Sequence, residues 1–246
     1  MLKDRRISME NRLLAALPKG EYERLIPHLE PFAIKAKEFL YTDNQPIEYV
    51  YFLQSGAASL LTRMDNNTFL EVATVGNEAM VGLPVFLGVH QISWQACLQI
   101  LPGSALRMRA EIFQREVPPT SSLHMLLQRY TQALFNQVTH LAACNRLHST
   151  KQRCCRWLLG TYDRTGSEQL NLTQESLSQM LGVRRASVSE VAVFLQQAGM
   201  LRYSRGKVHI LDRNGLEANS CECYGKIKRE YDGLLGAYRN REPTEK

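Results

Sequence analysis

The apolar and polar positions in the first part of the chain predict short helices followed by short strands. Leu13 and Leu17 lie at helical spacing, and the spacing resumes after Pro18, which predicts short helices over residues 9–30. From about residue 31 the apolar runs become short and alternating, with turn residues between them. Strands are predicted over residues 39–41, 49–53, 58–62, 69–74, 94–100 and 104–108.

Turn signals separate these runs at residues 43–46, 55–56, 65–67 and 102–103. Short strands separated by turns are typical of an antiparallel β-roll, and we expect one in the first domain. Between Gly76 and Gly88 the alternation stops, and three glycines in this stretch predict a loop with a short helix.

A long amphipathic helix is predicted after Pro118 and Pro119, with Ser121 or Ser122 as its N-cap. Its apolar residues recur in steps of three and four, close to a heptad pattern. Polar residues surround this stripe, so we expect it to meet the same helix of a second copy; packing against the chain's own domain is the alternative. The stripe consists of Leu123, Leu127, Tyr130, Leu134, Val138 and Leu141. A further helix is predicted over residues 150–163.

The segment over residues 172–191 has the form of a helix-turn-helix. Thr173 can cap the first helix, and Gly182 supplies the tight turn that lets a second helix cross the first. Val183 is expected to fill the angle between the two helices. The apolar positions that hold both helices to a core are Leu177, Met180, Leu181, Val188, Val191 and Leu195.

A basic hairpin follows the second helix. Residues 200–204 and 207–211 predict a strand pair around Arg205-Gly206, which would form a wing. We therefore expect a winged helix-turn-helix that binds double-stranded DNA, and the alternative is a winged helix that binds another protein. The expected DNA-binding residues are Thr173, Gln174, Arg184, Arg185, Ala186, Ser187, Ser189, Glu190, Arg205 and Lys207.

The distribution of charge favours DNA. The chain has a formal net charge of +6, with 13 basic and 13 acidic residues in residues 1–144 and 17 and 11 in residues 145–246. The positive excess therefore lies in the part that contains the helix-turn-helix, which indicates a polyanionic partner for that part.

The order of a β-roll, a long helix and a winged helix-turn-helix resembles the Crp/Fnr family of bacterial transcription regulators over about residues 13–211. Residues 48–56 (EYVYFLQSG) resemble the family's strand-and-turn motif, and residues 174–187 and 195–201 resemble its C-terminal pattern. The resemblance implies a homodimer that binds a pseudo-palindromic operator through successive major grooves, about 34 Å apart. It also implies RNA polymerase as a partner, and an effector state of the roll that sets the orientation of the DNA-binding domains.

The resemblance also implies how bases are read. Arg185 matches the family's guanine-reading arginine, which can pair with O6 and N7. Ala186 stands where the family has an acidic residue that accepts from cytosine, and Glu190 stands where an arginine often lies. The operator should therefore share a guanine with the family's usual site and differ beside it. Phosphate or groove-edge contacts are expected from Arg184, Ser187, Arg205 and Lys207.

The family's cyclic-nucleotide cassette is degenerate in this chain. Cyclic-AMP-binding members use a Gly-Glu pair at the ribose and an Arg-Ser or Arg-Thr pair at the phosphate. Here Leu83 replaces the acidic residue, and no arginine occurs between Arg63 and Arg107. A buried phosphate would lack a cation, so we expect an unidentified effector or none, and a cyclic-nucleotide-responsive regulator with an atypical pocket is the alternative. The residues assigned to such an effector pocket are Gly82, Leu83, Gln91, Ile92 and Ser93.

No metal and no cofactor is expected. The six cysteines should be reduced thiols, and Cys154-Cys155 and Cys221-x-Cys223 are poorly spaced for zinc. The family's iron–sulfur sensors use cysteines near the N-terminus, whereas the first cysteine here is Cys97. Haem ligation by His90 or Cys97 has no positive indication.

Enzyme classes are not favoured either. A cupin-like oxygenase needs two or three histidines inside the roll, and residues 31–106 contain one histidine, His90. The chain has no Gly-x-Ser-x-Gly, P-loop or dinucleotide motif. No apolar run approaches the roughly 18 residues of a membrane helix, and residues 1–6 are not followed by the apolar run of a signal peptide. We therefore expect a cytoplasmic regulator that is not an enzyme.

Together these features predict an α+β protein with four parts. Residues 1–118 would form the β-roll domain, 119–144 the dimerisation helix, and 145–213 the winged helix-turn-helix domain. Residues 214–246 extend past the family's usual end, and an added helix is predicted there from the spacing of Ile227, Tyr231, Leu234 and Leu235.

Overall fold

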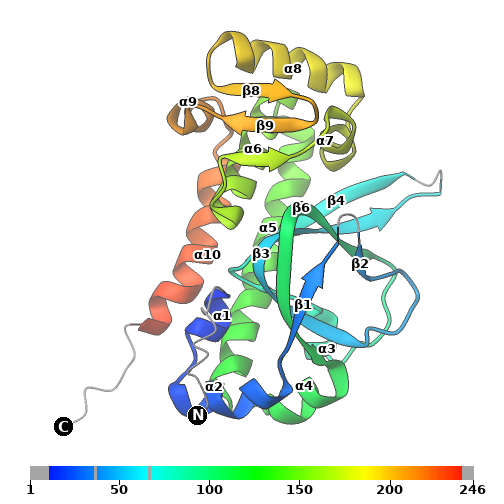
Figure 1. Ribbon diagram of the computed structural model, residues 1–246, viewed down its shortest axis with the longest axis vertical. Helices are drawn as coiled ribbons and strands as arrows, with labels where there is room; N and C mark the ends of the chain where they lie inside the picture. The colour runs from blue at the N-terminus through cyan, green and yellow to red at the C-terminus, as the bar shows by residue number, and fades with distance from the viewer. Residues whose placement is uncertain (1–10, 36–37, 66–67, 240–246) are drawn as a thin grey trace, which may run out of the picture.

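The computed structural model describes residues 11–35, 38–65 and 68–239. The expectations for residues 1–10, 66–67 and 240–246 lie outside these ranges. A curled sheet and short N-terminal helices form one end of the molecule, and a small sheet with its own helices forms the other (Figure 1). The long helix α5 (Ser122–Leu147) runs along both parts.

The larger sheet confirms the predicted antiparallel roll. Its strand order is β1-β6-β3-β4, with β2 paired to β6 and β5 paired to β3, and every pairing is antiparallel. The strands are β1 (Glu30–Ile34), β2 (Phe39–Tyr41), β3 (Tyr49–Arg63), β4 (Phe69–Val75), β5 (Met80–Val81) and β6 (Gln95–Arg109). The helices of this part are α1 (Arg12–Ala15), α2 (Lys19–Leu25), η1 (Ile26–His28), α3 (Leu83–Phe86) and α4 (Ala110–Glu116).

Two strands are longer than predicted, because two glycines lie within strands rather than between them. Strand β3 continues through Gly56, where a φ of 81° and shifts in register mark a bulge. Strand β6 continues through Gly103, where a Cβ atom would collide with Leu98. The predicted turns at residues 55–56 and 102–103 are therefore wrong: both glycines permit a bend or a close approach inside a continuous strand. Strand β1 was not predicted.

The two predicted central helices are confirmed. Ser121 is the N-cap of α5, and its side chain accepts a hydrogen bond from His124 N at 3.1 Å. Helix α6 (Thr150–Thr165) begins with a capping box, in which Ser149 and Gln152 satisfy each other's backbone amides. None of the described helices combines the length and the apolar character needed to cross a membrane.

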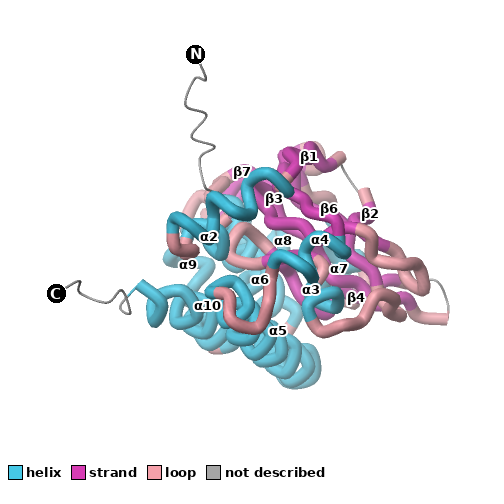
Figure 2. The backbone as a smooth tube through the Cα atoms, turned by 90° about the horizontal axis from the view of Figure 1, so that it is seen from below, coloured by secondary structure: helices cyan, strands magenta, loops and turns pink. Residues whose placement is uncertain are grey.

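The predicted C-terminal helix is also confirmed, as α10 (Cys223–Arg239). It lies beside α5, as both views show (Figures 1 and 2). Its buried residues Ile227 and Tyr231 join the core of the roll, and the Tyr231 hydroxyl donates to Gln137 Oε1 of α5 at 2.7 Å. The extension is therefore an integral layer of the fold.

The stripe of α5 that was predicted to meet a partner helix is mostly buried inside a single chain. Leu123, Leu127 and Tyr130 have no exposed surface, and Leu141 is 5% exposed. Leu134 is partly buried against the same core, whereas Val138 is 37% exposed. The alternative interpretation, packing against the chain's own domain, therefore describes most of this stripe, because the roll and α10 cover it.

The second, smaller sheet belongs to the C-terminal part and has the order β7-β9-β8. Strands β8 (Leu201–Ser204) and β9 (Lys207–Ile210) form the predicted wing, and β7 (Gln169–Asn171), which was not predicted, pairs with β9. The helices of this part are α7 (Gln174–Leu181), α8 (Arg185–Gln197) and α9 (Arg213–Ala218).

Candidate nucleic-acid interface

Local hydrogen bonds fix the helix-turn-helix. The Thr173 side chain caps α7 by accepting a hydrogen bond from Ser176 N at 3.0 Å. Gly182 ends α7 in the left-handed conformation, with a φ of 61°, and Val183 N donates to Ser178 O at 3.0 Å. The predicted capping and turn residues therefore have the roles that the sequence indicated.

Helix α8 presents one face to the core and the other to solvent. Val188 and Leu195 are fully buried, and Val191 is half-buried. Along the outward face, the exposed residues are Arg184, Arg185, Ala186 and Glu190, while Ser187 and Ser189 are half-buried. Figure 1 shows α8 along the outer edge of the molecule. Its N-terminal end is therefore open to a large partner.

Two of the predicted DNA-binding residues contact each other. Ser189 Oγ lies 2.7 Å from Gln174 Oε1 and 3.1 Å from Arg185 O. A serine hydroxyl has a single hydrogen, so it donates to one of these acceptors at a time. Gln174 is half-buried, and this contact holds the start of α7 against the first turns of α8. Both residues have a structural role in positioning α8.

The wing is a tight two-residue hairpin. Arg205 has a φ of 47° and Gly206 a φ of 76°, between the paired residues Ser204 and Lys207. Gly206 O accepts a hydrogen bond from Leu172 N at 2.9 Å, which ties the wing to the segment before α7. The side chains of Arg205 and Lys207 are exposed at its tip.

The interface cations are uncompensated. Within the described parts of the chain, no acidic side chain forms an ion pair with the exposed basic residues of α8 and the wing, which are Arg184, Arg185, Arg202, Arg205 and Lys207. Exposed cations without partners attract a polyanion and release its counterions on binding.

A buried carboxyl joins the roll to α6. Glu71 of β4 is 6% exposed and accepts hydrogen bonds from Thr74 Oγ1 at 2.9 Å, from Trp157 Nε1 at 2.8 Å and from Ser59 Oγ. Burial raises the pKa of Glu71, and the three donors act in the opposite direction. Since Trp157 belongs to α6, this hydrogen bond connects the roll to the helix that precedes the DNA-binding elements.

The turn of the helix-turn-helix packs on the same strands. Ser59 Oγ lies 3.5 Å from Met180 Sδ of α7, and a Cβ atom at Gly182 would lie 2.6 Å from Leu70 Cδ1 of β4. The roll and α7 are therefore in direct contact, so a change in strand position would act on the helix-turn-helix without an intermediate element.

Of the five residues assigned to an effector pocket, Gly82, Leu83 and Gln91 pack or hydrogen-bond within the roll. Leu83 is 5% exposed within the core of the roll, and a Cβ atom at Gly82 would lie 3.0 Å from Val50 Cγ1. The Gln91 side-chain amide donates to Asn44 O at 2.7 Å. Ile92 is half-buried and Ser93 is exposed. The effector pocket at these residues stays a prediction.

A cavity of about 210 Å³ lies elsewhere, between the roll, α5, α6 and α10. Its polar lining includes Asn77, Gln137 and Arg164, and Arg164 Nε donates to Glu78 Oε1 at 2.7 Å. None of the five predicted pocket residues lines it.

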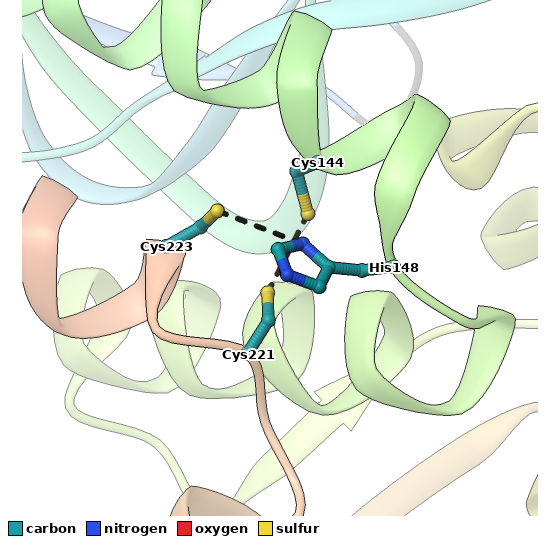
Figure 3. Close-up of side chains that lie close together, drawn as sticks. All are labelled: Cys144, His148, Cys221 and Cys223. Carbon is teal, nitrogen blue, oxygen red and sulfur yellow. Dashed lines mark hydrogen bonds between the residues drawn. The ribbon is translucent and has the colours of Figure 1, made fainter.

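The structure also brings together four side chains of types that can bind a metal ion, a set that the sequence did not indicate. Cys144, His148, Cys221 and Cys223 have their ligand atoms within 4.8 Å of one another (Figure 3). The missed signal is the Cys-x-x-x-His spacing at the end of α5, which places two ligands one helical turn apart. The other two ligands lie more than 70 residues further along the chain, so no local spacing reveals the set.

Comparisons with known proteins agree with this geometry. Residues 152–219 match the model of the Crp-like helix-turn-helix domain. No curated protein sequence matches the chain. Solved structures with the same fold include FixK2 from Bradyrhizobium japonicum, at 16% identity and a TM-score of 0.66, which covers 78% of this chain and 98% of that one.

Two further structures show the same similarity. TTHB099, a transcriptional regulator of the CRP family from Thermus thermophilus, has 18% identity and a TM-score of 0.62, and covers 78% of this chain and 96% of that one. CLP, a c-di-GMP responsive global regulator from Xanthomonas campestris, has 17% identity and a TM-score of 0.62, and the match covers 78% of this chain and 99% of that one. Residues 152–219 are therefore a Crp-like helix-turn-helix domain, and the chain has the fold of the DNA-binding transcription regulators of the Crp/Fnr family.

Proposed function

We propose that the protein is a sequence-specific transcription regulator that binds a pseudo-palindromic operator as a homodimer. The observation that carries this proposal is the exposed, uncompensated N-terminal end of α8, with Arg184 and Arg185 side by side. A helix end of this kind enters a major groove, where its first residues reach base edges. The protein acts by binding rather than by catalysis, in the cytoplasm, with RNA polymerase as its partner on DNA.

Each exposed residue has a separate role in this proposal. Arg185 pairs with O6 and N7 of a guanine, and the Ala186 methyl group lies beside it where a thymine methyl would fit. Glu190 accepts from a cytosine amino group one helical turn further along. Arg205 and Lys207 at the wing tip, together with Arg184, contact phosphates, which position the protein without reading sequence.

The outer face of α5 supports a dimer. Met125 is 45% exposed, Phe135 62% and Val138 37%, although all three are large apolar residues. Exposed positions recur along this face in steps of three and four, through residues 125, 128, 132, 135, 139 and 142. A two-fold axis would place the same stripe of two copies face to face, so in this proposal a second copy of α5 covers Met125 and Phe135 and sets two recognition helices on one face.

The experiment that tests this function is selection of duplexes from a random pool by the purified protein, at near-physiological salt, with and without cyclic AMP. We expect an inverted repeat with half-sites about one helical turn apart, recovered in both conditions. Recovery only with cyclic AMP would contradict the effector assignment and favour the cyclic-nucleotide-responsive alternative. Absence of any enriched sequence would point to a missing effector or to the protein-binding alternative.

A further inference from the structure

The four clustered ligand side chains come from two segments that are distant in sequence. Cys144 and His148 lie at the C-terminal end of α5, where His148 N donates to Cys144 O at 3.1 Å and His148 is the C-cap. Cys221 and Cys223 flank the start of α10. Figure 3 shows the three sulfur atoms around the imidazole ring, with both segments contributing to one compact group.

The distances fit one tetrahedral ion. The Sγ atoms of Cys144 and Cys221 are 3.5 Å apart, and Cys223 Sγ is 3.8 Å from His148 Nδ1. With a zinc–sulfur bond of about 2.3 Å, the edge of a tetrahedron is about 3.8 Å. A disulfide requires about 2.05 Å between its sulfur atoms, and the six cysteines are free. An iron–sulfur cluster distributes its four ligands over several irons, so ligands on different irons lie further apart than the 4.8 Å within which all four lie here.

The histidine is oriented as a metal ligand by a carboxylate. His148 Nε2 lies 3.1 Å from Glu222 Oε2, whereas Nδ1 lies 3.8 Å from Cys223 Sγ. A proton on Nε2 is therefore shared with Glu222, and Nδ1, the ring nitrogen beside Cys223, is left unprotonated. A carboxylate on the outer nitrogen of a metal-binding histidine is the usual arrangement around zinc, because it fixes the tautomer and the ring.

Nearby cations complement the charge of such a site. Three thiolates, a neutral imidazole and Zn²⁺ carry a net charge of −1. The guanidinium groups of Arg153 and Arg156 lie close enough for electrostatic interaction with the thiols of Cys144 and Cys221. The Nε atoms of both arginines are buried without a hydrogen-bond partner. A negatively charged centre beside them offsets the cost of burying these cations.

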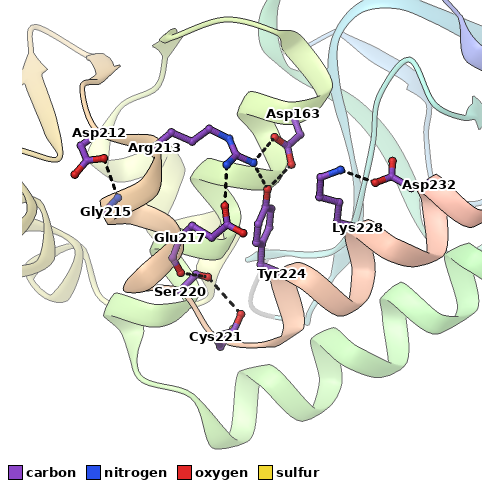
Figure 4. Close-up of polar contacts among 10 residues, drawn as sticks. All are labelled: Asp163, Asp212, Arg213, Gly215, Glu217, Ser220, Cys221, Tyr224, Lys228 and Asp232. Atoms are coloured by element: carbon purple, nitrogen blue, oxygen red, sulfur yellow. Dashed lines mark hydrogen bonds and ion pairs between the residues drawn. The ribbon is translucent and has the colours of Figure 1, made fainter.

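Other contacts hold the ligand segment in place. Arg213 donates to Tyr224 Oη at 2.6 Å and lies 3.3 Å from Asp163 Oδ1, while Tyr224 donates to Asp163 Oδ2 at 2.6 Å (Figure 4). These bonds join α6, α9 and α10 directly beside Cys223. The ligands are therefore positioned by the fold, as preorganised metal sites require.

We propose that Cys144, His148, Cys221 and Cys223 bind one Zn²⁺ in a tetrahedral site that fastens the start of α10 to the junction between α5 and α6. Three thiol protons leave to solvent as three Zn–S bonds form, and His148 binds through its unprotonated Nδ1. All four positions are taken by protein, so the site is structural and has no open coordination position. This proposal is independent of DNA binding.

The first test is metal analysis of the full-length protein, purified under reducing conditions. We expect one zinc ion per chain by inductively coupled plasma mass spectrometry. Replacement by Co²⁺ should give the visible absorption of a tetrahedral cobalt centre together with thiolate charge-transfer bands. A chain that retains no zinc and binds no Co²⁺, an iron–sulfur absorption spectrum, or a Cys144–Cys221 disulfide in the peptide map would each overturn the assignment.

Variants identify the ligands. The double variant Cys221→Ser/Cys223→Ser should lose the metal, whereas Cys155→Ala, which removes a buried thiol outside the cluster, should keep it. Glu222→Gln should keep the fold, since Glu222 is 60% exposed, and should weaken zinc affinity about 10- to 100-fold in competition with a chromophoric chelator. Wild-type metal content in the double variant, or unchanged affinity in Glu222→Gln, would refute the proposed ligand set.

Discussion

The hydrogen bond from Trp157 to Glu71 is the contact between the roll and α6 that is most open to measurement. Trp157 is 3% exposed, and its Nε1 atom donates to Glu71 Oε1 at 2.8 Å. Trp157→Phe retains most of the ring packing and removes the donor. A hydrogen bond to a charged group contributes about 1.5–3 kcal/mol, so at a pH where Glu71 is ionised the melting temperature of a chain of this size should fall by about 3–12 °C.

The fall in melting temperature caused by Trp157→Phe should also depend on pH. The folded pKa of Glu71 is raised above its unfolded value, so ionisation of this carboxyl removes stability as the pH rises through the folded pKa. Without the Trp157 donor the ionised form is less well stabilised. The difference in melting temperature between Trp157→Phe and wild type should therefore widen as the pH rises from acid to neutral. Thermal unfolding monitored by circular dichroism measures this difference.

Two controls make this prediction refutable. Trp94→Phe removes the other tryptophan, which is half-buried in the roll, and should give a smaller, pH-independent change. In a Glu71→Gln background the acceptor is no longer charged, so Trp157→Phe should cost about 0.5–1.5 kcal/mol. Equal losses in the wild-type and Glu71→Gln backgrounds, or a gap that does not change with pH, would refute the role of this hydrogen bond.

Single substitutions in the wing, in α5 and in α7 test the DNA contacts, the dimer and the helix cap. Arg205→Ala should weaken binding to all duplexes alike and reduce the salt slope by about 1, in fluorescence anisotropy titrations; a loss confined to one sequence would contradict a phosphate contact. Phe135→Glu should convert the dimer to a monomer in sedimentation experiments. Arg115→Glu, at an exposed site on α4, is the control and should stay dimeric, and a dimeric Phe135→Glu would contradict the α5 interface. Thr173→Ala should lower the melting temperature by about 2–4 °C, because α7 loses a cap contributing about 1 kcal/mol, and an unchanged value would argue against the cap.

The features that were predicted correctly are those determined over a few residues. The Thr173 cap, the left-handed Gly182 and the hairpin at Arg205-Gly206 depend on local backbone geometry, which residue type indicates directly. The same local rule failed at Gly56 and Gly103. There the long antiparallel pairing of β3 with β6 outweighs the preference of glycine for a turn, and that pairing joins residues about 50 positions apart.

The face of α5 could not be assigned from sequence for a related reason. The helix has apolar residues on two sides, and periodicity does not say what covers each side. Tyr130 meets the roll and α10, whereas Phe135 is exposed. The C-terminal segment that forms α10 determines which face of α5 is buried, and it lies some 90 residues further along the chain. The group that includes Cys144 and Cys223 has no local sequence pattern, because the same packing of α10 on α5 assembles it.

The measurement that tests the central claim most directly is the discrimination of Arg185→Ala between the selected operator and a duplex in which the contacted guanine is replaced. If Arg185 reads that base, the wild-type preference should fall by about 5- to 150-fold, which corresponds to about 1–3 kcal/mol, and affinity for the altered duplex should change much less. Arg115→Ala, which removes the same charge from the roll, should keep the full preference. Full preference in Arg185→Ala would contradict sequence reading by α8.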